Sequence, residues 1–310
     1  MRSWEPQLAT DFRLYASDQN RPRAHGGRQE ALEGEQPYWL LLPQWLARNW
    51  QRSRQTPVLD RHFVEEILWG QYCLFLCIKI HDDIFDAQTR RLSLIYAGDA
   101  FLAKACEVFS HYFETSSPFW KFFYSSLDGT LRTIDAIDRH ERSGRLQGLR
   151  SLRLIAKEDA ILKIASYAVC LKADRKEDFP RVARFADEMA IVGQTIDDLQ
   201  DMESDLERGR INPAASCLLC LRGDGHRPGP RTLHRILMNL RNKDVSTKLF
   251  SALRRRVDRA ARAIAPLGIP EAEAFLRSCQ VHLERMESRF HRERVKLIFG
   301  PYATMNISRG

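Results

Sequence analysis

Almost every apolar segment of this 310-residue sequence repeats with the three-to-four-residue period of an α-helix, and the two-residue alternation of β-strands is nearly absent. Short polar or Gly/Pro stretches separate these segments. Hydrophobic residues make up 44% of the chain, which is enough for a sizeable core. The sequence therefore predicts an all-α fold, a single-domain antiparallel helical bundle, with helices over residues 38–50, 60–86, 92–113, 117–138, 147–173, 178–206, 212–221, 231–240, 244–265 and 271–298.

The first 36 residues differ from the rest of the chain. They are polar, contain Pro22 and the pair Gly26 and Gly27, and show no sustained period. We expect residues 1–36 to form a poorly ordered N-terminal tail, residues 37–300 the helical domain, and residues 301–310 a C-terminal tail. The clearest loop, residues 222–230, is rich in Gly and Pro and falls inside the predicted domain.

Charge and hydropathy limit the classes of partner. No apolar run reaches the length of a membrane-spanning helix, and the first residues lack the apolar stretch of a secretory signal. We therefore expect a cytoplasmic protein without a transmembrane segment. A formal charge of +8 suits an anionic partner, but no recognisable nucleic-acid-binding module is present. We expect no nucleic-acid partner, because excess arginine serves a small phosphorylated ligand equally well.

Two predicted helices carry aspartate clusters whose first residues lie 115 positions apart, HDDIFD at residues 81–86 and DDLQDMESD at residues 197–205. Residues four apart share one face of a helix, so each cluster places its acids in a stripe. Like charges so close repel unless cations neutralise them, and Mg²⁺ prefers oxygen ligands and combines carboxylates with phosphate oxygens. The clusters predict a Mg²⁺ site with the metal ligands Asp82, Asp83, Asp86, Asp197, Asp201 and Asp205.

Apolar residues continue both acidic stripes toward the start of each helix. The first stripe runs back from Asp82 through Ile78 to Leu74, and the second from Asp197 through Gly193 to Met189. The missing side chain of Gly193 leaves room on that face. Two facing helices of this kind would form a deep apolar pocket with metal at its mouth, which suits a substrate with a diphosphate head and a hydrocarbon tail.

These segments resemble those of the class I isoprenoid synthase superfamily, which includes polyprenyl diphosphate synthases, squalene and phytoene synthases, and class I terpene synthases. Residues 82–86 are similar to the first DDxxD motif, and residues 97–102, AGDAFL, to the GDxLL segment. Lys157 and Gln194 lie where the superfamily has the lysine of its Lys-Thr motif and the glutamine of FQxxDD. Residues 201–211 resemble the DxxxD and RGRI elements of phytoene-type synthases.

The resemblance implies an isoprenoid synthase bundle with a central apolar cavity, an allylic prenyl diphosphate as substrate, and three Mg²⁺ ions that Mn²⁺ can replace. It leaves a homodimer open. It also implies catalytic roles for Asp82, Asp86, Asp197, Asp201 and Asp205, diphosphate binding by Arg90, Arg91, Lys157, Gln194, Arg208 and Arg210, and a pocket lined by Leu74, Cys77, Ile78, Met189 and Gly193.

The functional prediction rests on the tail length and on one departure from the motifs. In the related synthases the residues four and five before the first aspartate limit the tail; here they are Ile78 and Cys77, neither aromatic, which predicts a tail of fifteen carbons or more. The GGKRxRP segment with which chain-elongating synthases bind isopentenyl diphosphate is missing, since residues 26–29 read GGRQ. We therefore predict a Mg²⁺-dependent class I terpene synthase that converts the allylic diphosphate to a terpene hydrocarbon or alcohol plus diphosphate. Prenyl transfer, by head-to-head coupling or chain elongation, is the alternative.

Three other interpretations carry less weight. His81 and Asp82 also match the centre of HD-type metal phosphohydrolases, with His62 as an upstream ligand, but that pattern leaves the second cluster unexplained. A non-catalytic partner subunit of another synthase would release no pyrophosphate alone. A single aspartate cluster is more often a solvated helix end than a metal site, whereas two clusters with matching surroundings favour the metal site.

Overall fold

The computed structural model describes residues 6–19, 37–52, 59–85, 89–143, 152–207, 211–221 and 242–305. The regular structure within these ranges is entirely helical, which confirms the all-α prediction. The predicted helix over 231–240 lies outside them. The elements are α1 (Pro6–Gln19), α2 (Tyr38–Arg52), α3 (Arg61–Phe85), α4 (Leu94–Ser110), α5 (Pro118–Ser143), α6 (Leu152–Glu158), η1 (Asp159–Lys163), α7 (Ile164–Lys172), η2 (Lys176–Asp178), α8 (Phe179–Glu207), α9 (Pro213–Leu221), α11 (Lys243–Ile264), η3 (Ala265–Leu267) and α12 (Pro270–Met305).

Two compact units make up the chain. The first unit comprises Met1–Asp128 and Ala160–Pro180, and the second comprises Gly129–Asp159 and Arg181–Gly310. The domain limits expected from the sequence, 37 and 300, stay a prediction. No helix in the described part of the chain is long and apolar enough to span a membrane.

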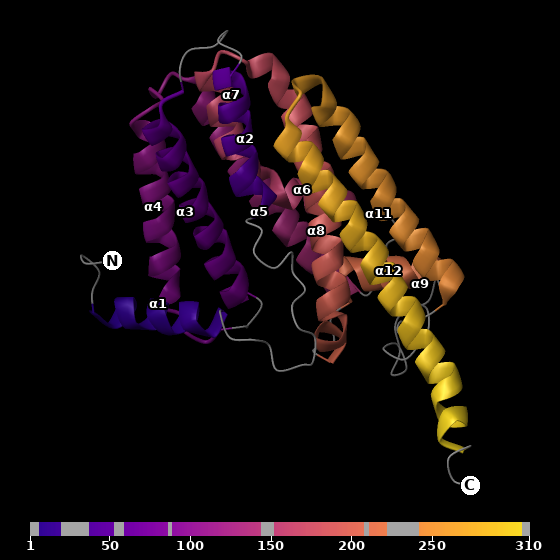
Figure 1. Ribbon diagram of the computed structural model, residues 1–310. Coiled ribbons are helices and arrows are strands. Elements are labelled where there is room, and N and C mark those ends of the chain that lie inside the picture. Colours follow the sequence, from indigo (N-terminus) through magenta and orange to yellow (C-terminus); the bar gives the residue numbers. More distant parts are fainter. Residues whose placement is uncertain are drawn as a thin grey trace. The chain divides into compact units, whose positions relative to one another are not determined.

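The first unit is built on the pair α3 and α4, which run side by side (Figure 1). The close approach of these helices depends on Gly70 of α3, because a Cβ atom there would come within 3.0 Å of the ring of Phe109 on α4. Phe109 is completely buried and extends into an aromatic cluster in which the rings of Phe113 and Phe119 stack 4.2 Å apart. Helices α2 and α7 pack against α3 as well.

Helix α1 lies within the region that the sequence predicted as a poorly ordered tail. It lies across the ends of α3 and α4 (Figure 1) and contacts α4. Ala9 and Tyr15 are buried, and the ring of Phe12 lies 5.3 Å from that of Phe101 on α4. The remaining residues of the predicted tail, 1–5 and 20–36, lie outside the described residues.

The predicted helix over residues 147–173 is broken in the structure into α6, the 3₁₀ turn η1 and α7. Buried side chains from other helices bind the backbone at this break. The amide of Gln71 on α3 donates to the carbonyl of Ile161 at 3.2 Å and accepts from the N–H of Ala165 at 2.9 Å. Thr130 of α5 donates to the carbonyl of Glu158 at 2.6 Å. These bonds satisfy backbone groups that an uninterrupted helix would pair internally.

In the second unit α11 and α12 form an antiparallel hairpin (Figure 1). Asn242 caps α11 by accepting a hydrogen bond from the N–H of Asp244, and Gly268 supplies the left-handed backbone, φ +60°, at the turn after η3. The facing sides of the hairpin are apolar at helical spacing, with buried Leu249, Leu253, Val257, Ala260, Leu276, Cys279 and Leu283.

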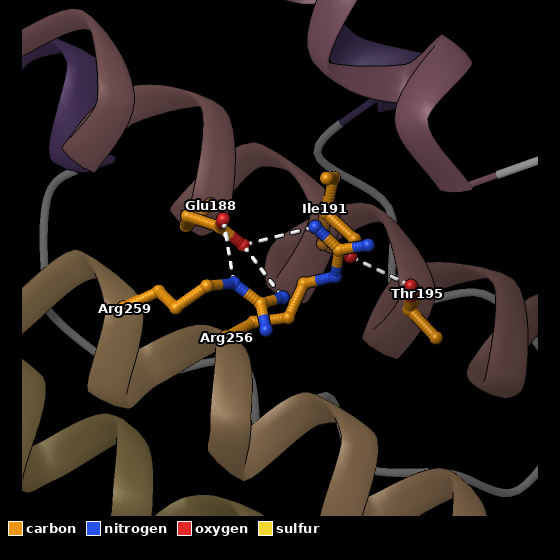
Figure 2. A network of polar contacts seen from close by, with 5 residues as sticks. All are labelled: Glu188, Ile191, Thr195, Arg256 and Arg259. Atoms are coloured by element: carbon orange, nitrogen blue, oxygen red, sulfur yellow. Dashed lines mark hydrogen bonds and ion pairs between the residues drawn. The ribbon is translucent and has the colours of Figure 1, made fainter. Parts of the chain in front are cut away.

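A buried ionic network joins α8 to α11 in the same unit (Figure 2). Glu188 of α8 accepts hydrogen bonds from Arg259 at 2.8 Å and from Arg256 at 2.9 Å. Burial raises the pKa of Glu188, but the hydrogen bonds and charges of the two arginines outweigh burial, and the net pKa lies below its ordinary value. The carboxylate is therefore charged at neutral pH and holds α8 in register with α11.

Candidate functional site

The first aspartate cluster begins in the last turn of α3. Asp82 is half-buried, whereas Asp83 is completely buried. One oxygen of Asp83 accepts a hydrogen bond from the hydroxyl of Tyr15 on α1 at 2.6 Å, and the other pairs with Lys79 one turn earlier on α3. Both carboxylate oxygens of Asp83 thus contact protein donors, and its role as a metal ligand stays a prediction. Asp86 lies outside the described residues.

The second cluster occupies the last turns of α8. Asp197 is exposed and Asp201 is half-buried. Asp205, also half-buried, accepts a hydrogen bond from the side-chain amide of Asn212 at 2.8 Å. The i, i+4 stripe predicted from the sequence is therefore present on one helix, as expected from the spacing.

Asp198, the neighbour of Asp197, is buried. Its carboxylate accepts hydrogen bonds from Gln194 at 2.9 Å and from the N–H of Ala214, in the first turn of α9, at 3.1 Å. Burial raises the pKa of Asp198 to about 7, against these two hydrogen bonds, which lower it. Asp198 therefore ties the end of α8 to the start of α9.

The two clusters share one arrangement. In each Asp-Asp pair the first residue, Asp82 or Asp197, reaches solvent, and the second, Asp83 or Asp198, points into its own unit. Successive residues of an α-helix are rotated by about 100°, so a buried second aspartate places the first on the accessible side. In each pair the second aspartate is thus held inside the protein, and the first presents its carboxylate to solvent.

Asn212 is a residue of this site that sequence reasoning missed. Its amide nitrogen donates to the backbone carbonyl of Asp198 as well as to Asp205, both at 2.8 Å, and its oxygen accepts from the N–H of Ala215 at 2.9 Å. The signal was available in the sequence, because Asn before Pro213 is typical of a helix N-cap followed by proline at the first helical position. The bonds to α8 could not be predicted, since they require the fold.

The predicted diphosphate-binding residues lie on several elements. Arg90 is exposed, and Arg91, half-buried, donates to the backbone carbonyl of Asp11 on α1 at 3.2 Å. Lys157 is exposed in the last turn of α6, at the start of the helix break. Gln194 is exposed on α8 and bonds Asp198. Arg208 and Arg210 lie outside the described residues.

The predicted pocket residues divide into buried and accessible positions. Leu74, Cys77 and Met189 are buried, and Ile78 is half-buried. The thiol of Cys77 lies 3.7 Å from Nδ1 of His81, and burial raises its pKa to about 12, which keeps it an unreactive thiol. Gly193 is exposed, and a Cβ atom built there would meet no atom within 4 Å. The central cavity stays a prediction.

The phosphohydrolase alternative is wrong on geometric grounds. His62 and His81 both lie on the continuous helix α3, 19 residues apart, which corresponds to about 28 Å along the axis. The two rings cannot ligate one metal ion. His81 instead packs on Gly98, where a Cβ atom would come within 2.9 Å of its Nε2, and the same nitrogen lies 3.5 Å from a carboxylate oxygen of Asp99.

The carboxylates fit Mg²⁺ when phosphate completes the coordination. Across the ranges that the structure describes, no three His, Cys, Asp or Glu side chains gather as a preformed metal cage. Mg²⁺ seldom requires such a cage, because it keeps waters and is bound by one or two carboxylates together with substrate phosphates. Asp82, Asp197 and Asp201 meet that requirement, since each is an oxygen donor that reaches solvent.

The buried Asp198 gives the protein a testable pH dependence. Its folded pKa, about 7, lies above its ordinary value of 3.8, so the folded protein binds the proton more tightly than the unfolded chain does. The free energy of unfolding should therefore fall as pH rises from about 4 to about 7, by up to about 1.4 kcal/mol per pH unit from this group.

Urea denaturation of the wild type and of Asp198→Asn, without divalent metal, isolates this contribution. The stability of the variant relative to wild type is expected to increase between pH 4 and pH 7, because asparagine carries no charge to bury. A difference that stays constant across this range would contradict the assignment.

The fold is similar to that of solved polyprenyl synthases. A medium/long-chain prenyl pyrophosphate synthase from Arabidopsis matches with a TM-score of 0.62 at 15% identity, over 92% of this chain and 99% of that one. A polyprenyl synthase from Roseobacter denitrificans matches at 0.58 and 15% identity, over 90% and 96%. A decaprenyl diphosphate synthase from Rhodobacter capsulatus matches at 0.59 and 14%, over 92% and 98%.

No protein-family model matches the sequence, and no curated protein matches it. The structural likeness extends over nearly the whole described chain, whereas the sequence identity is low. The chain therefore has the helical fold of these polyprenyl synthases, which is the fold expected from its two aspartate motifs.

Proposed function

We propose that the protein is a Mg²⁺-dependent prenyltransferase that ionises a linear allylic prenyl diphosphate and transfers the prenyl group to a second substrate. The observation that carries the proposal is the combination of the polyprenyl synthase fold with an outward aspartate at the matching place of both motifs, Asp82 on α3 and Asp197 on α8. Asp201 and Asp205 add carboxylates on α8, and Asp86 follows α3 in the sequence.

The aspartates of both clusters would hold Mg²⁺, which supplies positive charge to the diphosphate as it leaves. The basic residues complete the binding of the head group. Arg90 and Arg91 offer planar guanidinium groups that can donate two hydrogen bonds to one phosphate, and Lys157 offers a compact charge. Arg208 and Arg210 follow the second cluster in the sequence and extend the same basic set.

The apolar part of the substrate would follow the stripes that lead away from the acids. Gly193, exposed and without a neighbour within 4 Å of a Cβ atom, gives the tail room beside Met189, and neither Ile78 nor Cys77 carries an aromatic ring that would block it. We therefore propose a substrate tail of fifteen carbons or more.

Filling the space at Gly193 should shorten the accepted tail. Gly193→Phe is expected to lower kcat/KM for a twenty-carbon diphosphate at least roughly tenfold relative to a ten-carbon one, because the ring occupies the path of the longer chain. The comparison is made by competing the two substrates in one incubation.

Gly129→Phe is the matched control, since Gly129 is also helical and has no neighbour within 4 Å of a Cβ atom. It should leave the ratio of the two substrates unchanged. If Gly193→Phe and Gly129→Phe gave the same ratio of kcat/KM for the two substrates, the substrate tail would not pass Gly193.

A second candidate, the terpene synthase, is favoured by one sequence observation, the missing GGKRxRP segment. Incubation with ten-, fifteen-, twenty- and twenty-five-carbon diphosphates, with and without isopentenyl diphosphate, separates the two. Prenyl transfer predicts larger prenyl diphosphates that require isopentenyl diphosphate, or coupled products from two allylic molecules. Hydrocarbons or alcohols with an unchanged carbon number would identify the cyclase, and no release of pyrophosphate with Mg²⁺ would contradict both.

A further inference from the structure

Helix α1 makes two contacts, one with the first aspartate cluster at the end of α3 and one with the residues that precede α4. Its apolar side is docked by buried Ala9 and Tyr15 and by the ring contact of Phe12 with Phe101. Its polar side faces the end of α3 and the start of α4, where the side chains of Tyr15 and Asp11 make their hydrogen bonds. The helix therefore has both an apolar anchor and polar contacts with the motif.

The first contact holds the last turn of α3. The hydroxyl of Tyr15 donates to Asp83 at 2.6 Å, while Lys79 takes the other carboxylate oxygen. Burial, followed by the hydrogen bond to Asp83 and the negative charges of Asp83 and Asp82, raises the pKa of Tyr15, so the phenol stays protonated and remains a donor. Asp83 is completely buried.

The second contact holds the residues that precede α4. The hydroxyl of Ser93 donates to the carboxylate of Asp11 at 2.6 Å, and the guanidinium of Arg91 donates to the backbone carbonyl of Asp11 at 3.2 Å. The N–H of Thr89 donates to the carbonyl of Asp83 at 3.2 Å. Both ends of the connection between α3 and α4 are thereby tied to α1, and Arg91 is fixed at a defined place beside the cluster.

We propose that α1 is a positioning element of the diphosphate site, in which Tyr15 and Asp11 fix the rotation of the last turn of α3 and the place of Arg91. The inference rests on the proposed function. With Asp83 held inward, Asp82 is turned by about 100° to the accessible side and keeps that orientation before substrate binds. Orientation fixed in advance strengthens binding, because less conformational freedom is lost on association.

The test is Tyr15→Phe, which removes the hydroxyl and keeps the ring. Its effect is measured as Mn²⁺ binding in the presence of inorganic pyrophosphate, by titration calorimetry without turnover. The apparent affinity is expected to weaken about fivefold or more, since Asp83 loses one of its two donors and the last turn of α3 gains freedom. Peptide-level hydrogen exchange should also become faster over residues 89–93.

Tyr112→Phe is the matched control. Tyr112, which follows α4, donates to the carboxylate of Glu66 on α3 at 2.5 Å, so it makes the same kind of bond to the same helix, away from the cluster. This variant should leave Mn²⁺ and pyrophosphate binding unchanged. If Tyr15→Phe does not fold, Ser93→Ala removes the bond at the other contact and is expected to weaken binding in the same direction.

The outcomes separate the two proposals. If the wild type binds but neither Tyr15→Phe nor Ser93→Ala weakens binding more than Tyr112→Phe does, the positioning role of α1 is overturned. The proposed function would then still stand. Wild-type protein that takes up no Mn²⁺ with pyrophosphate would overturn the proposed function, and the role of α1 with it.

Discussion

Replacing Asp197 or Asp82 with asparagine is expected to lower kcat/KM for an allylic diphosphate by roughly 10²–10³-fold. Asparagine has the same shape as aspartate but no charge, so it binds Mg²⁺ poorly, and without the metal the negative charge of the leaving diphosphate is no longer offset. Pyrophosphate release from farnesyl or geranylgeranyl diphosphate at saturating Mg²⁺ measures the loss. Each variant should unfold at nearly the wild-type urea concentration, because both side chains reach solvent.

Glu65→Gln is the control for this experiment. Glu65 is an exposed acid on the same helix as Asp82, paired with Arg61, and should be neutral for turnover. Activity of Asp82→Asn and Asp197→Asn within about threefold of wild type would mean that these carboxylates take no part in binding the diphosphate.

Glu188→Gln is expected to give the largest loss of stability, about 3 kcal/mol in the free energy of unfolding. The substitution removes the only negative charge drawn between Arg256 and Arg259 in Figure 2 and leaves two half-buried cations side by side. Urea denaturation followed by far-UV circular dichroism measures the change. Glu65→Gln breaks an exposed pair, with side chains 90% and 57% accessible, and should change stability by less than about 0.5 kcal/mol.

A second substitution tests the cause of that loss. Removing one of the two stranded charges with Arg256→Met should recover part of the stability of Glu188→Gln, because an apolar replacement needs no counter-charge. A loss below about 1 kcal/mol in the single variant, or no recovery in the double variant, would show that the network contributes little.

Local sequence patterns predicted the features that depend on neighbours along the chain. Helical period predicted the helices of both aspartate clusters, and four-residue spacing predicted the stripe of Asp197, Asp201 and Asp205 on α8. Both features depend only on residues within one helix, so the sequence alone is enough to predict them. Helical spacing places Asp198 off this stripe, but it does not reveal that Asp83 is buried, because that burial involves Tyr15 of a distant segment.

Features that depend on distant residues could not be predicted. Gln71 interrupts the helix over 147–173 from a position about 90 residues away, and nothing near Ile161 in the sequence indicates a break. Tyr15 fixes Asp83 across 68 residues, from a segment whose own composition predicts disorder. Such contacts override local propensity, and only the folded chain reveals which backbone and carboxylate groups they satisfy.

The proposed function requires the aspartates of each cluster to bind a metal ion together with diphosphate, and metal-directed cleavage tests this requirement most directly. Fe²⁺ in place of Mg²⁺, with ascorbate and inorganic pyrophosphate, generates radicals that cut the backbone close to the bound ion. We predict cuts near residues 82–86 and near residues 197–205 that both require pyrophosphate. The first cuts should disappear in Asp82→Asn and the second in Asp197→Asn. Cleavage at one cluster alone, or at neither, would contradict the proposed function.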